Sequence, residues 1–296
     1  MSPSPPDWIP LRSDALGAEI DPQGAQLSVL RDLHQRDLLW NGDAAVWKGR
    51  APVLFPVVGA LNGGRYRWQG ASHALGRHGF ARDRRFNIAR HDAHEALLRL
   101  TDDAESRKVY PFAYELDVLF RVEGTRLTTV ASVRNTGNGP LPASLGFHPA
   151  FRWPLSTAAA RDAYFLEFEK DEPAPIRRLD AQGLLTNEQH ATPVRGRRLQ
   201  LDDALFIDDV IVFDELKSRR VTYGAANGPR IEVSFPDATY LGLWTKPGAG
   251  FICIEPWRGV ADPQGFNGEF SQKPGVFVVP PGASEALTMH FDCLPG

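Results

Sequence analysis

Hydrophobic and polar residues alternate with a period of two wherever this chain shows a clear pattern. Over residues 115–123 every second residue is apolar and the residues between are mostly charged, and the alternation resumes over residues 126–133. Gly124-Thr125 separates the two runs and has the composition of a hairpin turn. The pattern therefore predicts an antiparallel β-hairpin over these two segments.

Shorter apolar or alternating runs between turn residues predict the remaining strands. Gly, Pro and Asn recur between these runs, for example in Asn227-Gly228-Pro229 and Pro280-Pro281-Gly282. Strands are predicted over residues 65–68, 95–100, 163–168, 209–213, 230–235, 241–245, 251–255, 276–279 and 286–291.

No segment longer than ten residues has the 3.6-residue period of an amphipathic helix. Many strands between Gly- and Pro-rich turns, without alternating helices, indicate an all-β antiparallel sandwich or barrel with few short helices. No linker-like tract and no internal repeat divides the sequence. Residues 1–296 are therefore expected to form a single large β domain, in which residues 1–12 are a loosely ordered tail.

Composition narrows the class of protein. Of 296 residues, 43% are hydrophobic and 23% are charged, values typical of a soluble globular protein. The net charge of −3 gives no general attraction to nucleic acid or to an anionic membrane, so neither is expected as a partner. No basic segment followed by an apolar run begins the chain, and no apolar stretch reaches eighteen residues. We therefore expect a cytoplasmic protein.

The two cysteines, Cys253 and Cys293, exclude a disulfide framework and make a structural zinc site unexpected. Neither lies beside a histidine or in an electropositive run, so thiol catalysis is not expected. No phosphate-binding glycine motif, HExxH or GxSxG motif occurs. The basic clusters 82–85 and 195–198 are interpreted as solvated loops or, at most, an anion site. No metal or other cofactor is expected.

Two of the eight histidines and one glutamate stand out by their neighbours. His78 lies between glycines and two arginines, and His148 lies between an aromatic residue and a proline. Glu255 ends an apolar run, so it either faces solvent at a sheet end or enters a cleft. Burial in a cleft would raise its pKa and make it a general base. Trp244 and Trp257 offer flat faces that suit sugar C–H groups but would equally suit the core.

With these residues in view, the chain resembles the aldose 1-epimerase (galactose mutarotase) family, particularly its shorter bacterial branch. The resemblance extends over most of the sequence, and the order and spacing of the fragments carry it. The fragments are Gly24-Ala25, Leu39-Trp40, Trp47, Ala51-Pro-Val-Leu-Phe-Pro56, Val58-Gly59, His78-Gly-Phe-Ala-Arg82, Gly146-Phe-His-Pro-Ala-Phe151, Asp208-Asp-Val-Ile-Val-Phe213, Phe251-Ile-Cys-Ile-Glu-Pro-Trp257, Gly275-Val276 and Pro281-Gly282.

The resemblance implies a large antiparallel β-sandwich, the galactose mutarotase-like supersandwich, with a sugar lying in a cleft. It implies that His148 is the general acid, Glu255 the general base, and that His78 and Asp209 hold sugar hydroxyls. Asp208 is adjacent to Asp209, and strand alternation allows only one of the two to face the cleft. Trp244 is a further candidate for sugar binding.

The sequence departs from the family pattern in one respect. Sugar-binding members often carry an arginine soon after the Pro-Val-Gly stretch, where this chain has Ala60 and Leu61. Arg77 and Arg82, which flank His78, are candidates to replace it.

The resemblance implies an isomerase that opens and recloses the sugar ring, with the carboxylate and the imidazolium on either side of that ring. Two alternatives stay open. One is a hexose-6-phosphate 1-epimerase, with a phosphate site among Arg77, Arg82, Arg84 and Arg85. The other is a non-catalytic carbohydrate-binding or sensor protein. A small-molecule sugar is the expected partner, and the protein is expected to be a monomer or a homodimer.

Overall fold

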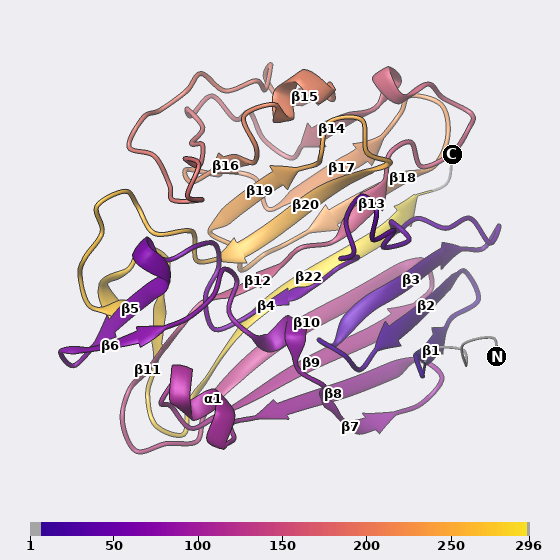
Figure 1. Cartoon of the computed structure of the whole chain (residues 1–296). Helices are drawn as coiled ribbons and strands as arrows, with labels where there is room; N and C mark the ends of the chain where they lie inside the picture. Colours follow the sequence, from indigo (N-terminus) through magenta and orange to yellow (C-terminus); the bar gives the residue numbers. More distant parts are fainter. Residues whose placement is uncertain (1–6, 295–296) are drawn as a thin grey trace.

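In the computed structural model, which describes residues 7–294, the chain consists almost entirely of antiparallel strands (Figure 1). Strands account for 45% of the chain and helices for 8%. The prediction of an all-β antiparallel sandwich with few short helices is therefore confirmed. The helical segments are α1 (Ala104–Val109) and the 3₁₀ turns η1 (Asn62–Gly64), η2 (Ala81–Asp83), η3 (Arg161–Ala163), η4 (Asp203–Phe206) and η5 (Phe270–Gln272).

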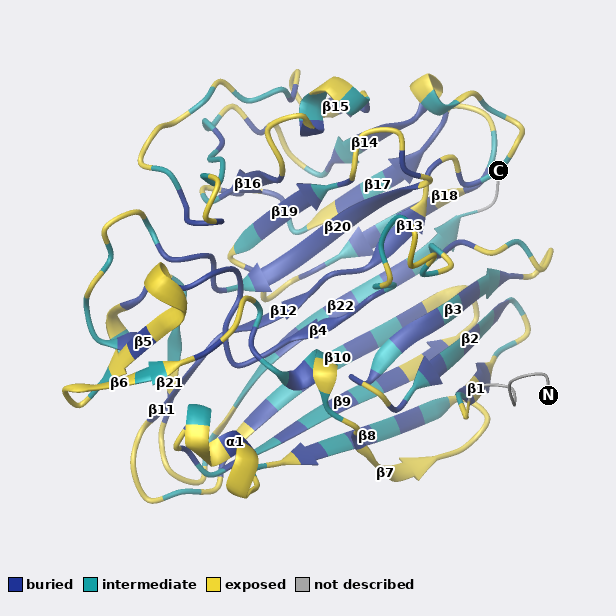
Figure 2. Cartoon of the chain, viewed as in Figure 1, coloured by how far each residue is buried: buried dark blue, intermediate teal, exposed yellow. Residues whose placement is uncertain are grey.

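One layer is a nine-stranded sheet in the order β15-β14-β17-β18-β22-β10-β9-β8-β7. Its central hairpin is the one that the alternating pattern predicts, with Arg126 opposite Glu123. In β9 and β10 every second residue is buried, as the alternation requires (Figure 2). In this order, the strands are Arg198–Gln200, Phe165–Phe168, Arg220–Gly224, Arg230–Ser234, Ser284–Leu294, Arg126–Asn135, Tyr114–Glu123, Glu95–Thr101 and Asn87–His91.

A second layer carries the strands that matter for function. It is a six-stranded sheet in the order β16-β19-β20-β12-β4, with β13 also paired to β20. Figure 1 shows β19 and β20 lying over the sheet that contains β22, and the two layers share the main apolar core. The strands are β16 (Ile211–Phe213), β19 (Tyr240–Trp244), β20 (Phe251–Arg258), β12 (Leu145–Phe147), β4 (Val53–Leu54) and β13 (Ala150–Arg152).

Three smaller sheets complete the described part of the fold. They are β1-β2-β3, β11-β21 and β5-β6. Their strands are β1 (Ile9–Arg12), β2 (Leu16–Asp21), β3 (Gln26–Asp32), β11 (Leu141–Ala143), β21 (Phe277–Val279), β5 (Arg65–Trp68) and β6 (Ala71–Ala74).

β20 is the only strand of more than five residues in the described part of the chain that is buried along nearly its whole length (Figure 2). Ile252 and Ile254 face the main core, while Cys253 and Trp257 belong to separate apolar clusters on its other face. Because side chains alternate along a strand, Glu255 lies on that second face, between these two clusters. A carboxylate is thereby placed at a buried position outside the main core.

The structure corrects several boundaries of the sequence prediction. The predicted loosely ordered tail 1–12 is wrong for Ile9–Arg12, which form β1 because Ile9 and Leu11 alternate into the core; residues 1–6 lie outside the described residues. The strand expected over residues 163–168 begins at Phe165, after η3. The strand expected over residues 209–213 begins at Ile211.

No helix in residues 7–294 is long and apolar enough to cross a membrane. That residues 1–296 form one domain stays a prediction.

Candidate active site

A cavity of about 290 Å³ opens on the outer face of the six-stranded sheet. All seven residues singled out from the sequence line it, although they come from distant segments of the chain. What each does there stays a prediction. They are His148, Glu255, His78, Asp209, Arg82, Arg77 and Trp244.

β20 and its neighbour β19 place Glu255 in the cavity. Glu255 pairs with Gly242 of β19, and its side chain is only 2% exposed. Gly242 is required by a close approach, because a Cβ atom there would lie 2.3 Å from the indole ring of Trp257. The bare backbone of Gly242 thus leaves room for Trp257, which lines the cavity beside Glu255.

Two short strands place His148 opposite Glu255. β12 pairs with the end of β20 and β13 pairs with its start, so residues 148–149 bridge the gap between them. Pro149 follows His148, and its carbonyl accepts a hydrogen bond from the amide of Ile254 at 3.2 Å. His148 Nε2 consequently lies 3.2 Å from Glu255 Oε2.

This contact corrects one expectation. The two groups were expected on either side of a sugar ring, but a distance of 3.2 Å leaves no room for a ring between them. Both groups can instead address one edge of a sugar, where two oxygen atoms are bonded to the same carbon. The pair therefore suits the anomeric carbon, which carries both the hydroxyl O1 and the ring oxygen O5.

Burial shifts both groups toward their uncharged forms. It raises the pKa of Glu255 well above its ordinary value, and the charge of Asp209 raises it further. Burial lowers the pKa of His148 to about 3, and the nearby positive charge of Arg82 also lowers it. Both shifts therefore favour the state in which the carboxyl of Glu255 and the imidazole of His148 are uncharged.

Aromatic rings surround the imidazole of His148. The indole of Trp47 stacks on it with centroids 5.0 Å apart and an interplanar angle of 27°. Trp244 and His78 meet it edge-on at 5.7 and 5.8 Å. Trp47 was not a site prediction, because it lies in a loop and no alternation or charge pattern distinguishes it in the sequence.

His78 is held by the backbone of the cavity wall. The Gly59 amide donates a hydrogen bond to His78 Nδ1 at 3.1 Å, so Nδ1 is an acceptor. Burial of the ring, followed by the charges of His148, Arg82 and Arg77, lowers the pKa of His78 well below its ordinary value. A neutral imidazole with Nδ1 as acceptor carries its proton on Nε2, where it can serve as a hydrogen-bond donor.

The ambiguity between Asp208 and Asp209 is resolved as to placement. Asp209 lines the cavity and Asp208 does not. Strand alternation was expected to separate the two residues, but both precede β16. Asp209 instead has a left-handed backbone with φ of 63°. The carbonyl of Asp209 accepts a hydrogen bond from Arg178 Nη1 at 2.9 Å, which holds this turn.

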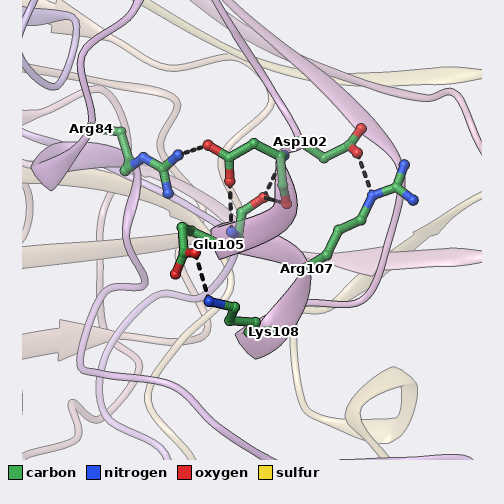
Figure 3. Close-up of polar contacts among 7 residues, drawn as sticks. Arg84, Asp102, Glu105, Arg107 and Lys108 are labelled. Carbon is green, nitrogen blue, oxygen red and sulfur yellow. Dashed lines mark hydrogen bonds and ion pairs between the residues drawn. The ribbon is translucent and has the colours of Figure 1, made fainter.

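Positive side chains also line the cavity, but not all those expected. Arg77 and Arg82 do so, and Arg82 Nη2 donates to the carbonyl of Arg77 at 3.0 Å. Arg84 is instead engaged at the start of α1, where it pairs with Asp103 (Figure 3). Arg85 pairs with Asp7 at 3.0 Å. Arg84 and Arg85 therefore do not contribute to an anion site in this cavity.

Lys246 supplies a positive charge that the sequence prediction missed. It lines the cavity just after β19, and its ammonium donates a hydrogen bond to the carbonyl of Val46. A lysine in a Lys-Pro-Gly turn gives no functional signal in the sequence. Its contact with Val46 ties the turn after β19 to the loop that carries Trp47.

One group of side chains in the described residues has the donor types of a metal site. Atoms of His148, Cys253 and Glu255 all lie within 4.8 Å of one another. The Cys253 side chain, however, packs with Ala150 and Phe251, and burial raises the pKa of its thiol well above the ordinary value. This raised pKa disfavours the thiolate that metal binding needs. The group is better explained by apolar packing beside the acid–base pair.

Comparison with known proteins identifies the family and the fold. The family model described as aldose 1-epimerase matches residues 7–277. A curated relative, the chromosomal protein LacX of Lactococcus lactis subsp. lactis, is 32% identical over 283 residues, which cover 92% of this chain and 95% of the relative.

Two solved structures have the same fold over nearly their whole lengths. A galactose mutarotase related enzyme from Lactobacillus acidophilus superposes with a TM-score of 0.91 at 26% identity, covering 97% of each chain. A galactose mutarotase-like protein from Lactobacillus casei superposes with a TM-score of 0.90 at 26% identity, covering 97% of this chain and 100% of the other.

Proposed function

Because the chain belongs to the aldose 1-epimerase family, we propose that it is an isomerase that interconverts the α and β anomers of an aldohexose. The observation that carries the proposal is the 3.2 Å contact between His148 Nε2 and Glu255 Oε2. This buried pair lines a cavity of about 290 Å³, close to the lower end of the range usual for small-molecule sites.

Ring opening needs two proton transfers, at the two oxygen atoms that are bonded to C1. One member of the pair removes the proton from O1, the other delivers a proton to O5, and the C1–O5 bond breaks to give the open-chain aldehyde. Rotation about C1–C2 then presents the other face of the carbonyl. On reclosure O5 returns its proton, O1 is protonated again, and both groups regain their starting states.

An uncharged carboxyl–imidazole pair meets these requirements without a net gain or loss of protons. The family resemblance assigns Glu255 as base and His148 as acid in ring opening. The raised pKa of Glu255 and the lowered pKa of His148 both favour the uncharged pair, in which the carboxyl can donate in the opening step and accept on reclosure. Since the roles exchange within each cycle, both groups act as acid and as base.

The activity is expected to be independent of pH across the range in which an ordinary histidine titrates, near pH 6.5. A lowered pKa for His148 means that the pair gains a second proton only in more acidic solution, near pH 3. The raised pKa of Glu255 favours its protonated form, which is the same uncharged pair. Polarimetric kcat/KM for an unphosphorylated sugar, corrected for the buffer reaction, measures this. An inflection near pH 6.5 would contradict the lowered pKa of His148.

A phosphorylated aldohexose is the second candidate substrate, because three cationic side chains line the cavity. Arg77, Arg82 and Lys246 provide more positive charge than a neutral sugar needs, and guanidinium groups suit phosphate. Within residues 7–294, the one ion pair of Arg82 is long, 3.7 Å to Asp83, and its Nη2 donates to the carbonyl of Arg77. Its guanidinium therefore retains capacity to bind an anion.

A polarimetric comparison of glucose, galactose and their 6-phosphates separates these candidates. If the phosphorylated sugar is the substrate, Arg82→Ala should lower kcat/KM for it by roughly 10- to 150-fold, the value of one charged hydrogen bond. The same variant should change the rate for the unphosphorylated sugar much less. Arg85→Ala, which removes an arginine outside the cavity, is the matched control. An equal loss on both sugars would exclude a phosphate role for Arg82.

A non-catalytic carbohydrate-binding protein would behave differently in the same assay. It would bind sugar without accelerating mutarotation of any of the four compounds.

A further inference from the structure

The imidazole of His148 lacks the support that usually orients a catalytic histidine. Such a ring generally makes a hydrogen bond through its second nitrogen, which fixes its tautomer and orientation. His148 Nδ1 is buried and has no hydrogen-bond partner in another described residue. Apart from the contact of Nε2 with Glu255, the orientation of the ring therefore depends on packing.

Trp47 is the one aromatic residue in the described part of the chain whose ring stacks on this imidazole. Its indole stacks on the imidazole with centroids 5.0 Å apart and 27° between the planes, whereas Trp244 and His78 contact it only by edges. A stacked indole also attracts a cation placed over its face. It therefore stabilises the imidazolium that forms whenever His148 holds a transferred proton.

The loop that carries Trp47 is fixed from several sides. The Trp47 amide donates to the carbonyl of Asp43 at 2.8 Å, and Trp40 Nε1 donates to the carbonyl of Trp47 at 2.8 Å. Lys246 donates to the neighbouring carbonyl of Val46. The Trp47 ring also stacks on Phe251 with centroids 5.4 Å apart. These contacts give the indole one position.

Gly49 allows the indole to take this position. A Cβ atom at Gly49 would lie 2.4 Å from the Trp47 ring, so a side chain there would displace it. The backbone of the loop and Gly49 are thus fitted to the placement of the indole over His148.

We propose that Trp47 is a positioning residue of the active site, whose indole face replaces the missing Nδ1 hydrogen bond in orienting His148. The proposal rests on the proposed function in naming His148 as a proton-transfer group. It assigns a role in proton transfer to an aromatic loop residue, and it predicts that this role is exerted through the imidazole. The effect should therefore fall on kcat more than on KM.

The test compares Trp47→Leu with Trp47→Phe. Leucine removes the aromatic face, and kcat should fall by roughly 2- to 30-fold with little change in KM, as expected for the loss of one cation–π contact. Phenylalanine keeps a weaker aromatic face and should restore most of the rate. Trp68→Leu removes an indole that packs on Phe112 away from the cavity, and its kcat should match the parent.

Proton NMR gives a second readout that needs no turnover. The Cε1 proton of His148, assigned by its absence in His148→Gln, should be shifted upfield in the parent by the ring current of the stacked indole. In Trp47→Leu the signal should move toward the position of an ordinary histidine, while in Trp68→Leu it should stay.

Two results would overturn the proposal. One is a Trp47→Leu variant with parental kcat, and the other is a loss of kcat without movement of the His148 signal. If the parent itself turns over no sugar, the proposed function fails, yet the NMR comparison still decides whether Trp47 orients His148.

Discussion

Glu255→Gln is expected to lower kcat for mutarotation by about 10²- to 10⁴-fold while sugar binding persists, because that range is typical of a positioned acid–base group. Glutamine fills the same volume in β20 and can still form hydrogen bonds, but it cannot exchange a proton at neutral pH. The buried position of Glu255 and its 3.2 Å contact with His148 make this loss specific to proton transfer. Polarimetry measures the rate, and calorimetric titration with sugar measures binding.

The corresponding variant of His148 tests whether the two groups act as a unit. His148→Gln should cause a loss of similar size, and the double variant should be scarcely worse than either single one, because groups that act as a unit are not additive. Glu123→Gln, at the exposed end of β9, is the control for a glutamate-to-glutamine change elsewhere. If Glu255→Gln kept parental rates on every sugar that the parent accepts, the assignment of the pair would be wrong.

Asp262→Asn is expected to reduce the free energy of unfolding by about 3–5 kcal/mol, the usual cost of breaking a buried ion pair. Asp262 Oδ1 lies 2.7 Å from Lys273 Nζ, and their side chains are 3% and 1% exposed. Asp262 Oδ2 also accepts the Asn62 amide at 2.8 Å. The asparagine keeps an acceptor for that amide but leaves the ammonium of Lys273 buried without a counter-charge.

Denaturant unfolding of the parent and of three variants tests this second expectation. Asp292→Asn breaks the exposed pair with Arg126 and should cost less than about 1 kcal/mol. The double variant Asp262→Asn/Lys273→Met removes both charges, keeps an acceptor for the Asn62 amide and should recover most of the loss. Equal unfolding free energies for Asp262→Asn and Asp292→Asn would show that the buried pair is not a special contributor to stability.

The Asp262–Lys273 pair also has a functional consequence. The Asp262 amide donates to the carbonyl of Ala60 at 2.9 Å, which joins the cavity segment 58–60 to the segment 260–261. Gly59 in turn holds His78 through its amide. A variant that loosens the contact between these two segments should therefore change KM more than kcat.

Much of the fold could be predicted because alternation is a local property. β9 and β10 lie within two residues of their predicted ends, since each buries every second side chain. β20 runs beyond its predicted end, through Pro256 to Arg258. The amide of Ile254 donates to Pro149, in the gap between β12 and β13. Because amide directions alternate along a strand, the nitrogen of Pro256 faces the same gap, and this proline removes no hydrogen bond to β19. The strand can therefore continue through Pro256.

The candidate site could be predicted only in part. The sequence alone singled out His148, Glu255 and His78, because each lies in a distinctive short motif. The family resemblance added Asp209. The contact between His148 and Glu255 depends on the register of β12 and β13 against β20, which the local sequence does not encode. Trp47 and Lys246 lie in loops, where no periodicity points to a side chain's direction.

We propose that this protein opens and recloses an aldohexose through the buried His148–Glu255 pair. The most direct measurement is the polarimetric rate at which freshly dissolved α-glucose, α-galactose and their 6-phosphates reach equilibrium with increasing amounts of the parent protein. We expect the rate for at least one of these sugars to rise in proportion to protein concentration, and Glu255→Gln at the same concentrations to give the buffer rate. Buffer rates for all four compounds with the parent protein would contradict the claim.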